Sequence, residues 1–182
     1  MISFFRVREN AVPPDRAHPS DAGMDVFFSP DSYTVFKGQN IHVGTAEFPE
    51  IEIEPGGNVL LPTGLKFGIP HGYMLQVCNR GSMGAKRSLV VGAHIVDSGY
   101  SGEVFVDLHN IGNERQVIKP GDKIAQLVMI PVMYVLPMEA HREESLYGMA
   151  PITISDRGEG ALGSSEKQEL PSFEKQEAAL SS

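Results

Sequence analysis

The stretch of chain from Val91 to Asn110 holds the residues best suited to chemistry. A carboxylate, Asp97, ends a short apolar run and stands three residues before Tyr100. The intervening Ser98 and Gly99 are turn-forming residues, so the carboxylate is expected on a tight bend after a strand. A carboxylate fixed in this way can take a proton from a water molecule. An Asx-type turn with no catalytic role explains the same residues equally well, so the rest of the chain must decide.

Two further segments combine a cation with groups that bind phosphate oxygens. The first places an arginine, a glycine and a serine within one turn, and the second joins an arginine to a glycine-rich stretch with two serines. Guanidinium groups, free backbone N–H groups and hydroxyls all donate hydrogen bonds to phosphate. A flexible glycine-serine linker is the alternative for the second segment. The candidate phosphate-binding residues are Arg80, Gly81 and Ser82 in the first segment, and Arg157, Gly163, Ser164 and Ser165 in the second.

The elements that must position these residues are short strands. Apolar runs recur at residues 2–7, 51–53, 59–61, 74–78, 89–91, 104–108 and 124–130. Turn triplets containing glycine lie between them at 55–57, 62–64, 70–72, 97–99 and 120–122. This spacing predicts an all-β sandwich or barrel. One short helix is predicted after Ser82, over residues 83–87.

The composition sets the domain organisation. A chain of 182 residues suits one domain with a tail. We predict a β domain over residues 1–150, with an extra loop or hairpin at about 31–50, and a Gly-rich C-terminal motif at 151–165. From 166 to 182 the residues are mostly polar and predict a disordered tail.

The charge and apolar content exclude several classes of partner. The formal net charge is -8, which disfavours binding to nucleic acid or to an anionic membrane surface. No apolar stretch approaches the roughly 18 residues of a membrane span, and the first residues lack the pattern of a signal peptide. The single cysteine, Cys78, cannot form an internal disulfide. We therefore expect a cytoplasmic protein that acts on a small molecule, without a nucleic-acid or membrane partner.

Five segments, in order, resemble the five motifs of the trimeric dUTP diphosphatase (dUTPase) family. They are residues 21–26, 80–86, 91–102, 120–127 and 156–164, and they contain Asp25, Arg80, Asp97, Tyr100, Gln126 and Arg157 in matching places. The resemblance runs from about residue 10 to residue 165, apart from the extra segment before residue 50. It implies a distorted jelly roll (dUTPase-like β-clip) in a homotrimer whose active sites are shared between subunits. The related dCTP deaminases have the same fold.

The resemblance also implies a reaction and roles at the base and sugar. The enzyme would hydrolyse dUTP to dUMP and pyrophosphate, which limits uracil incorporation into DNA and supplies dUMP. Asp97 would orient and deprotonate the water that attacks the α-phosphate, and Tyr100 would lie against the deoxyribose and exclude a 2'-hydroxyl. A hairpin over residues 91–96 would read the uracil edge, and Leu162 would cover the base. The residues implied at the hairpin are Val91, Gly92, Ile95 and Val96.

Phosphate and metal roles follow from the same resemblance. Arg80, Ser82 and Gln126 would hold the phosphates, and the loop with Arg157 would close over the γ-phosphate. A triphosphate needs a hard cation to enter a protein of this charge, which implies Mg²⁺ as cofactor. Asp25 would contact that ion as an outer-shell ligand, through metal-bound water.

Three departures from the family pattern leave alternatives open. Gly81 replaces the usual serine after the arginine, and Leu162 replaces an aromatic residue. These changes motivate a non-catalytic nucleotide-binding trimer as an alternative. Gly99 gives the turn a sequence similar to that of the deaminases, and Asp107 falls where their catalytic glutamate stands. A dCTP deaminase, or a bifunctional deaminase and diphosphatase, is therefore the other alternative.

Overall fold

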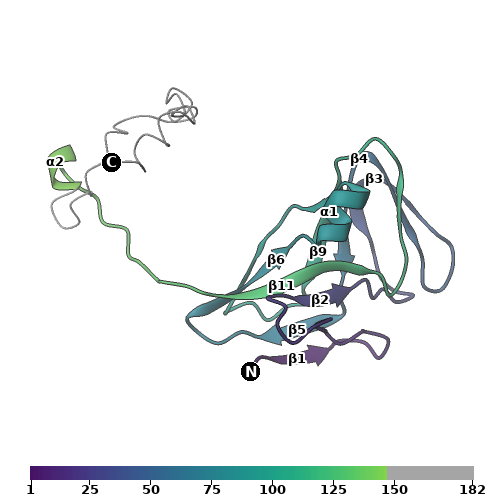
Figure 1. The fold of residues 1–182 in the computed structure, drawn as a ribbon, viewed down its shortest axis with the longest axis horizontal. Coiled ribbons are helices and arrows are strands. Elements are labelled where there is room, and N and C mark those ends of the chain that lie inside the picture. The colour runs from purple at the N-terminus through teal and green to yellow at the C-terminus, as the bar shows by residue number, and fades with distance from the viewer. Residues whose placement is uncertain (147–182) are drawn as a thin grey trace, which may run out of the picture. The chain divides into compact units, whose positions relative to one another are not determined.

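The computed structural model describes residues 1–146, and the chain divides into two compact units, Met1–Val135 and Leu136–Ser182. Every strand of residues 1–146 lies in the first unit, together with the helix α1 (Gly81–Arg87) (Figure 1). The described part of the second unit holds one helical turn, α2 (Glu143–Leu146), which the sequence did not predict. Within residues 1–146 no helix has the length and apolarity needed to cross a membrane. The predicted boundaries at residues 150 and 165 lie outside the described residues.

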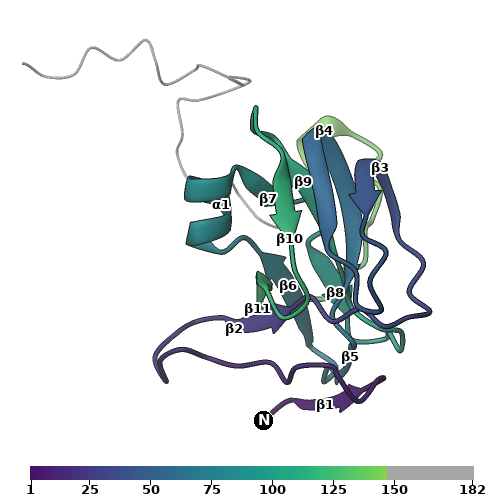
Figure 2. The ribbon, with the colours of Figure 1, turned by 90° about the vertical axis from the view of Figure 1, so that its right-hand side faces the viewer.

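The strands form three antiparallel sheets. The smallest pairs β1 (Ser3–Arg6) with β5 (Leu65–Gly68). The second has the order β2 (Met24–Phe27), β11 (Lys123–Pro131), β6 (Tyr73–Cys78), β8 (Ile95–Asp97). The third has the order β10 (Gln116–Ile118), β4 (Ile51–Pro62), β9 (Phe105–Asn110), β7 (Leu89–Val91). Figure 2 shows β4, β9, β7 and β10 side by side, with β3 (Lys37–Val43) beside β4.

The core is built from one face of each larger sheet. Along β6 and β9 buried and partly exposed residues alternate, as expected for strands with one face against a core. Leu75 and Leu127 are fully buried from one sheet, and Leu61, Val106 and Leu108 from the other. The all-β prediction is therefore confirmed. Functional side chains have to come from the opposite, outward faces of both sheets and from the loops.

The strand β4 corrects one predicted turn. The Pro-Gly-Gly triplet at 55–57 lies inside β4 rather than between two strands. Gly56 has a positive φ of 73°, and the register of β3 against β4 shifts here, so the triplet bends the strand without ending it. The bend lets β10 pair with the first part of β4 and β9 with the last part. The extra segment at 31–50 supplies β3, which pairs with β4 on both sides of the bend.

A partly buried ion pair ties the N-terminal segment to the turn before β9. Arg8 donates two hydrogen bonds to the Glu103 carboxylate, at 2.9 and 2.7 Å, and a third to the Ser29 carbonyl. The Gly64 N–H also donates to Glu103 Oε1, at 2.7 Å. Arg8 Nε lies 3.2 Å from Asp31. A hydrogen bond from the Thr34 hydroxyl, supported by the charge of Arg8, lowers the pKa of Asp31 despite the opposing effect of burial.

We predict that Glu103→Ala lowers the free energy of unfolding by about 2–4 kcal/mol, because it removes the two-pronged carboxylate partner of the shielded Arg8 guanidinium and leaves it only the longer contact with Asp31. Arg115→Ala is the matched control, since its ion pair with Glu52 is largely exposed. That substitution should cost about 1 kcal/mol or less. Urea unfolding of both variants measures the difference, and equal losses would contradict the assignment.

Candidate active site

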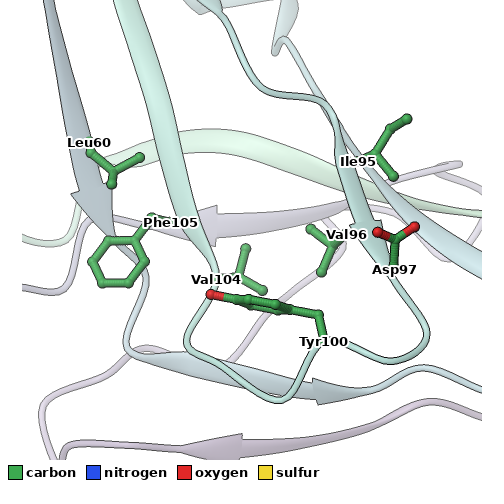
Figure 3. Close-up of a pocket in the computed structure, with 7 residues that line it drawn as sticks. All are labelled: Leu60, Ile95, Val96, Asp97, Tyr100, Val104 and Phe105. Atoms are coloured by element: carbon green, nitrogen blue, oxygen red, sulfur yellow. The ribbon is translucent and has the colours of Figure 1, made fainter.

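Asp97 lies at the rim of a shallow cavity of about 260 Å³. Figure 3 shows the Tyr100 ring across the floor, with Asp97 and Ile95 at one end and Phe105 at the other. The walls are otherwise apolar, from Leu60, Ile95, Val96, Val104 and Phe105. Asp97 and Tyr100 are both exposed. A carboxylate that is open to water beside an apolar surface can activate a water molecule next to a bound organic group.

The turn that carries Asp97 is held in place by its own hydrogen bonds. The Tyr100 N–H donates to the Asp97 carbonyl at 3.0 Å, and the Tyr100 hydroxyl donates to the Glu103 carbonyl at 2.8 Å. Gly102 lies against the ring, since a Cβ there would be 2.5 Å from Tyr100 Oη. The Tyr100 ring is therefore fixed as a flat surface beside Asp97.

The segment from Val91 to Val96 is not a hairpin, which corrects that prediction. β7 pairs with β9 in one sheet, whereas β8 pairs with β6 in the other. Between them, the Gly92 N–H donates to the Asp107 carbonyl, and the His94 carbonyl accepts from the Val77 N–H, both at 2.8 Å. The segment therefore crosses between the sheets, and its ends are anchored to different sheets. Ile95 and Val96 reach the cavity, whereas Val91 and Gly92 lie on the β9 side.

Asp107 is engaged in a pair with a neighbour on the same face of β9. Its Oδ2 lies 3.0 Å from His109 Nε2, and it does not line the cavity of Asp97. The two side chains pack against Gly92, where an added Cβ would be 2.4 Å from each. This arrangement makes Asp107 a support for the crossing segment and disfavours its use as the acid-base group of a deaminase.

A second group of polar side chains gathers around Asp25. Arg80 Nε donates to one carboxylate oxygen at 2.8 Å, and Lys123 Nζ donates to the other at 2.7 Å. Ser82 lies beside them, because its Oγ accepts from Arg80 Nη1 at 3.3 Å. Arg80 and Lys123 are partly exposed, so both cations are available to an anion. Gly81, the first residue of α1, would accept a side chain without contact, so this geometry does not require a glycine.

Lys123 was missed by the sequence analysis, although it lies within the 120–127 segment three residues before Gln126. Asn79 was missed as well. Its carbonyl accepts from Gln126 Nε2 at 2.9 Å, and its side-chain oxygen accepts from the Val91 N–H. Gly23 leaves room for Gln126, since a Cβ there would be 2.5 Å from the amide oxygen. The pairing of β11 with β2 on one side and with β6 on the other brings these residues together, so the sequence carried no separate signal for them.

The two groups lie apart along β6. Met74 pairs with Asp97 on one side of this strand, and Cys78 pairs with Gln126 on the other. Four residues of a strand span about 13 Å. A general base must reach its proton within about 3 Å, or through one water. Asp97 and Gln126 of one chain are therefore separated by much more than the reach of a direct hydrogen bond.

The Asp25 carboxylate does not fit a direct metal ligand, because both of its oxygens already bind cations. Within residues 1–146 no group of three or more His, Cys, Asp or Glu side chains is placed to hold a metal. Burial raises the pKa of the Cys78 thiol, which keeps it protonated and unreactive at neutral pH. The predicted site residues Arg157, Leu162, Gly163, Ser164 and Ser165 lie outside the described residues.

Sequence comparison identifies the family. The profile of the dUTPase family matches residues 47–165, which cover most of the chain. The match includes Asp97, Tyr100, Arg80, Lys123 and Gln126, whereas Asp25 lies before it. The chain belongs to the dUTPase family. A relative from Gloeobacter violaceus, named deoxyuridine 5'-triphosphate nucleotidohydrolase, is 35% identical and covers 84% of this chain and 87% of its own length.

Solved dUTPase structures share the fold. A variant of the dUTPase of Staphylococcus bacteriophage 80alpha, solved with dUpNHpp, superposes with a TM-score of 0.66 at 24% identity, covering 91% of this chain and 98% of the other. A variant of the dUTPase of phage phi11 of S. aureus superposes with a TM-score of 0.63 at 22% identity, covering 79% and 99%. The phi11 structure is described as revealing the coordination of a structural Mg(II) ion.

Gly92 provides a test of the crossing segment in this dUTPase fold. We predict that Gly92→Ala destabilises the protein by about 1–2 kcal/mol, because the added methyl group displaces the Asp107–His109 pair. Gly99→Ala is the control, since nothing lies within 4 Å of a Cβ there. It should change stability by less than about 0.5 kcal/mol. Combining Gly92→Ala with His109→Ala should restore part of the loss in thermal unfolding, and a double variant worse than the single one would refute the packing argument.

Proposed function

We propose that this chain hydrolyses dUTP to dUMP and pyrophosphate, which removes a source of uracil for DNA and supplies dUMP. Membership of the dUTPase family supports the reaction. The observation that carries the mechanism is the exposed Asp97 carboxylate beside the fixed Tyr100 ring. The cytoplasmic location expected from the sequence stays a prediction.

Asp97 acts as the general base in this proposal. It accepts a proton from a water molecule. The oxygen of this water forms a bond to the α-phosphorus, while the bond between the α-phosphorus and the oxygen that bridges it to the β-phosphorus breaks. Pyrophosphate leaves with that bridging oxygen, and the proton passes from Asp97 to solvent. The open rim of the cavity gives the water direct access to the carboxylate.

Tyr100 and the crossing segment select the nucleoside. The flat Tyr100 ring supports the deoxyribose, and a 2'-hydroxyl would meet the ring face, which favours deoxyribonucleotides. The backbone of Val91 and Gly92, with Ile95 and Val96, contacts the uracil. Leu162 supplies apolar cover from the C-terminal motif.

The cations around Asp25 hold the phosphates. Arg80, Ser82 and Gln126 form this group as the family resemblance implies, and Lys123 adds a second positive charge. Asp25 holds both cations in place before the nucleotide arrives, so less ordering is needed on binding. Phosphate oxygens then compete with Asp25 for these donors. Arg157, Gly163, Ser164 and Ser165 would complete the binding of the γ-phosphate.

Each active site is completed by another chain, in a homotrimer. The separation of Asp97 from Gln126 along β6 supports this arrangement, because a second chain could bring its phosphate-binding group closer to Asp97 than the group of the same chain. Apolar side chains near Asp97 support it too, since Ile95 and Phe105 are 64% and 37% exposed. Burying such side chains against a second subunit is favourable.

Mg²⁺ bound with the nucleotide would neutralise the phosphates of dUTP, and Asp25 is the residue that would hold it. The phi11 dUTPase structure with a structural Mg(II) ion supports a role for this metal in the family. Asp25 would touch the ion through water, once phosphate has drawn Arg80 or Lys123 away from its carboxylate.

The function is tested by pyrophosphate release with Mg²⁺ and each of dUTP, dCTP, dTTP, dATP, dGTP and UTP. We expect release from dUTP alone. Asp97→Ala should lower kcat by about two to four orders of magnitude while dUTP binding survives. Glu9→Ala, which removes an exposed carboxylate of the N-terminal segment, is the control and should keep full activity. Conversion of the cytosine ring of dCTP, or near-normal turnover by Asp97→Ala, would overturn the proposal.

The shared site is tested through the oligomeric state. We expect sedimentation at three times the mass of one chain, and we predict that Phe105→Glu shifts this toward a single chain, because a charge would be buried at the subunit contact. Tyr33→Glu, at an exposed aromatic residue of the 31–50 segment, should leave the trimer intact. A monomer with full dUTP turnover would exclude the shared site.

A further inference from the structure

An aromatic residue beyond the end of β11, Tyr134, contacts the turn that follows Asp97. The Tyr134 hydroxyl lies 3.3 Å from Ser98 Oγ, within hydrogen-bonding distance, and Ser98 directly follows Asp97. The ring of Tyr134 stacks on His71, with the centroids 4.7 Å apart and the planes 9° from parallel. One side chain therefore joins two turns that are far apart in sequence.

The backbone places Tyr134 across the end of β6. Pro131 pairs with Tyr73 at the start of this strand, and the Val132 N–H donates to the Gly72 carbonyl at 2.8 Å. β8, with Asp97 opposite Met74, lies on the other side of β6. The Tyr134 side chain thus reaches from the β11 side of β6 to Ser98 on the β8 side.

The Asp97 turn has particular need of such support. Gly99 lies two residues after Asp97, and glycine allows the backbone more conformations than any other residue. A Cβ at Gly99 would meet no neighbour within 4 Å, so packing does not hold this residue. Within the turn, the Tyr100 N–H to Asp97 carbonyl bond is the restraint closest to the carboxylate.

We propose that Tyr134 is a positioning residue for Asp97, which it restrains through the hydrogen bond to Ser98 while His71 holds its ring. This inference rests on the proposed function, in which Asp97 is the general base. Small displacements of a catalytic group are costly to rate, so a restraint on its turn acts on kcat. Tyr100 keeps its own hydrogen bond to the Glu103 carbonyl, and the phosphate-binding candidates lie outside this turn, so KM is less affected than kcat.

The test compares Tyr134→Phe, which keeps the stacked ring, with Ser98→Ala and with the double variant. Each single variant should lower kcat for dUTP about three- to tenfold, the effect of one hydrogen bond, with KM within about twofold of wild type. The double variant should be no slower than either single one, because both remove the same bond. Tyr33→Phe, at an 88% exposed tyrosine, is the matched control and should leave kcat unchanged.

Amide hydrogen exchange gives a second readout that does not depend on activity. Peptides covering residues 98–103 should exchange faster in Tyr134→Phe and Ser98→Ala than in wild type, while thermal unfolding stays the same. Unchanged exchange would show that Tyr134 does not restrain the turn, and faster exchange with an unchanged kcat would show that the restraint does not position Asp97. Independent, multiplicative losses in the double variant would also overturn the proposal. If wild type released no pyrophosphate from dUTP, the proposed function would fail, and exchange would still decide whether the restraint exists.

Discussion

The pairing of β6 with β8 on one side and β11 on the other fixes the distances on which the whole site depends. Backbone hydrogen bonds set the register, so Asp97 is locked to one end of β6 and Gln126 to the other. A strand does not shorten or slide without turning its buried residues outward. Asp97 and the candidate phosphate-binding cations therefore stay apart in one chain, which is why we propose that a second copy completes the site.

Each half of the site is prepared before substrate binds. Asp25 holds Arg80 and Lys123 close together although they repel each other, in a chain whose net charge is -8. In the proposed function, an incoming triphosphate would find its donors already gathered. This arrangement would weaken phosphate binding to some extent, because the phosphate and its counter-ion would compete with the Asp25 carboxylate for Arg80 and Lys123.

The loop that carries the base is secured at several points rather than buried. The Glu103 carbonyl accepts a hydrogen bond from the Tyr100 hydroxyl. The Glu103 carboxylate accepts hydrogen bonds from Arg8 and from the Gly64 N–H. Tyr134 holds Ser98 from the other side of β6. An exposed loop can thus keep a carboxylate open to water without letting it move freely.

The sequence by itself determined the all-β class, the helix after Arg80, the turns at 62–64, 70–72, 97–99 and 120–122, and the family. These follow from local rules, since glycine and proline set turn geometry and alternation of apolar residues sets strands. Such rules do not predict the contacts of Lys123, Asn79 and Tyr134. The partners of these residues lie in distant segments that only sheet pairing brings near. The prediction of a hairpin at residues 91–96 was wrong for the same reason. Two strands that are adjacent in sequence suggest a hairpin, and only their actual partners show that this segment crosses between sheets. Tertiary structure alone decided that Asp97 and the phosphate-binding group stand at opposite ends of β6, because that separation depends on register, which local sequence does not encode.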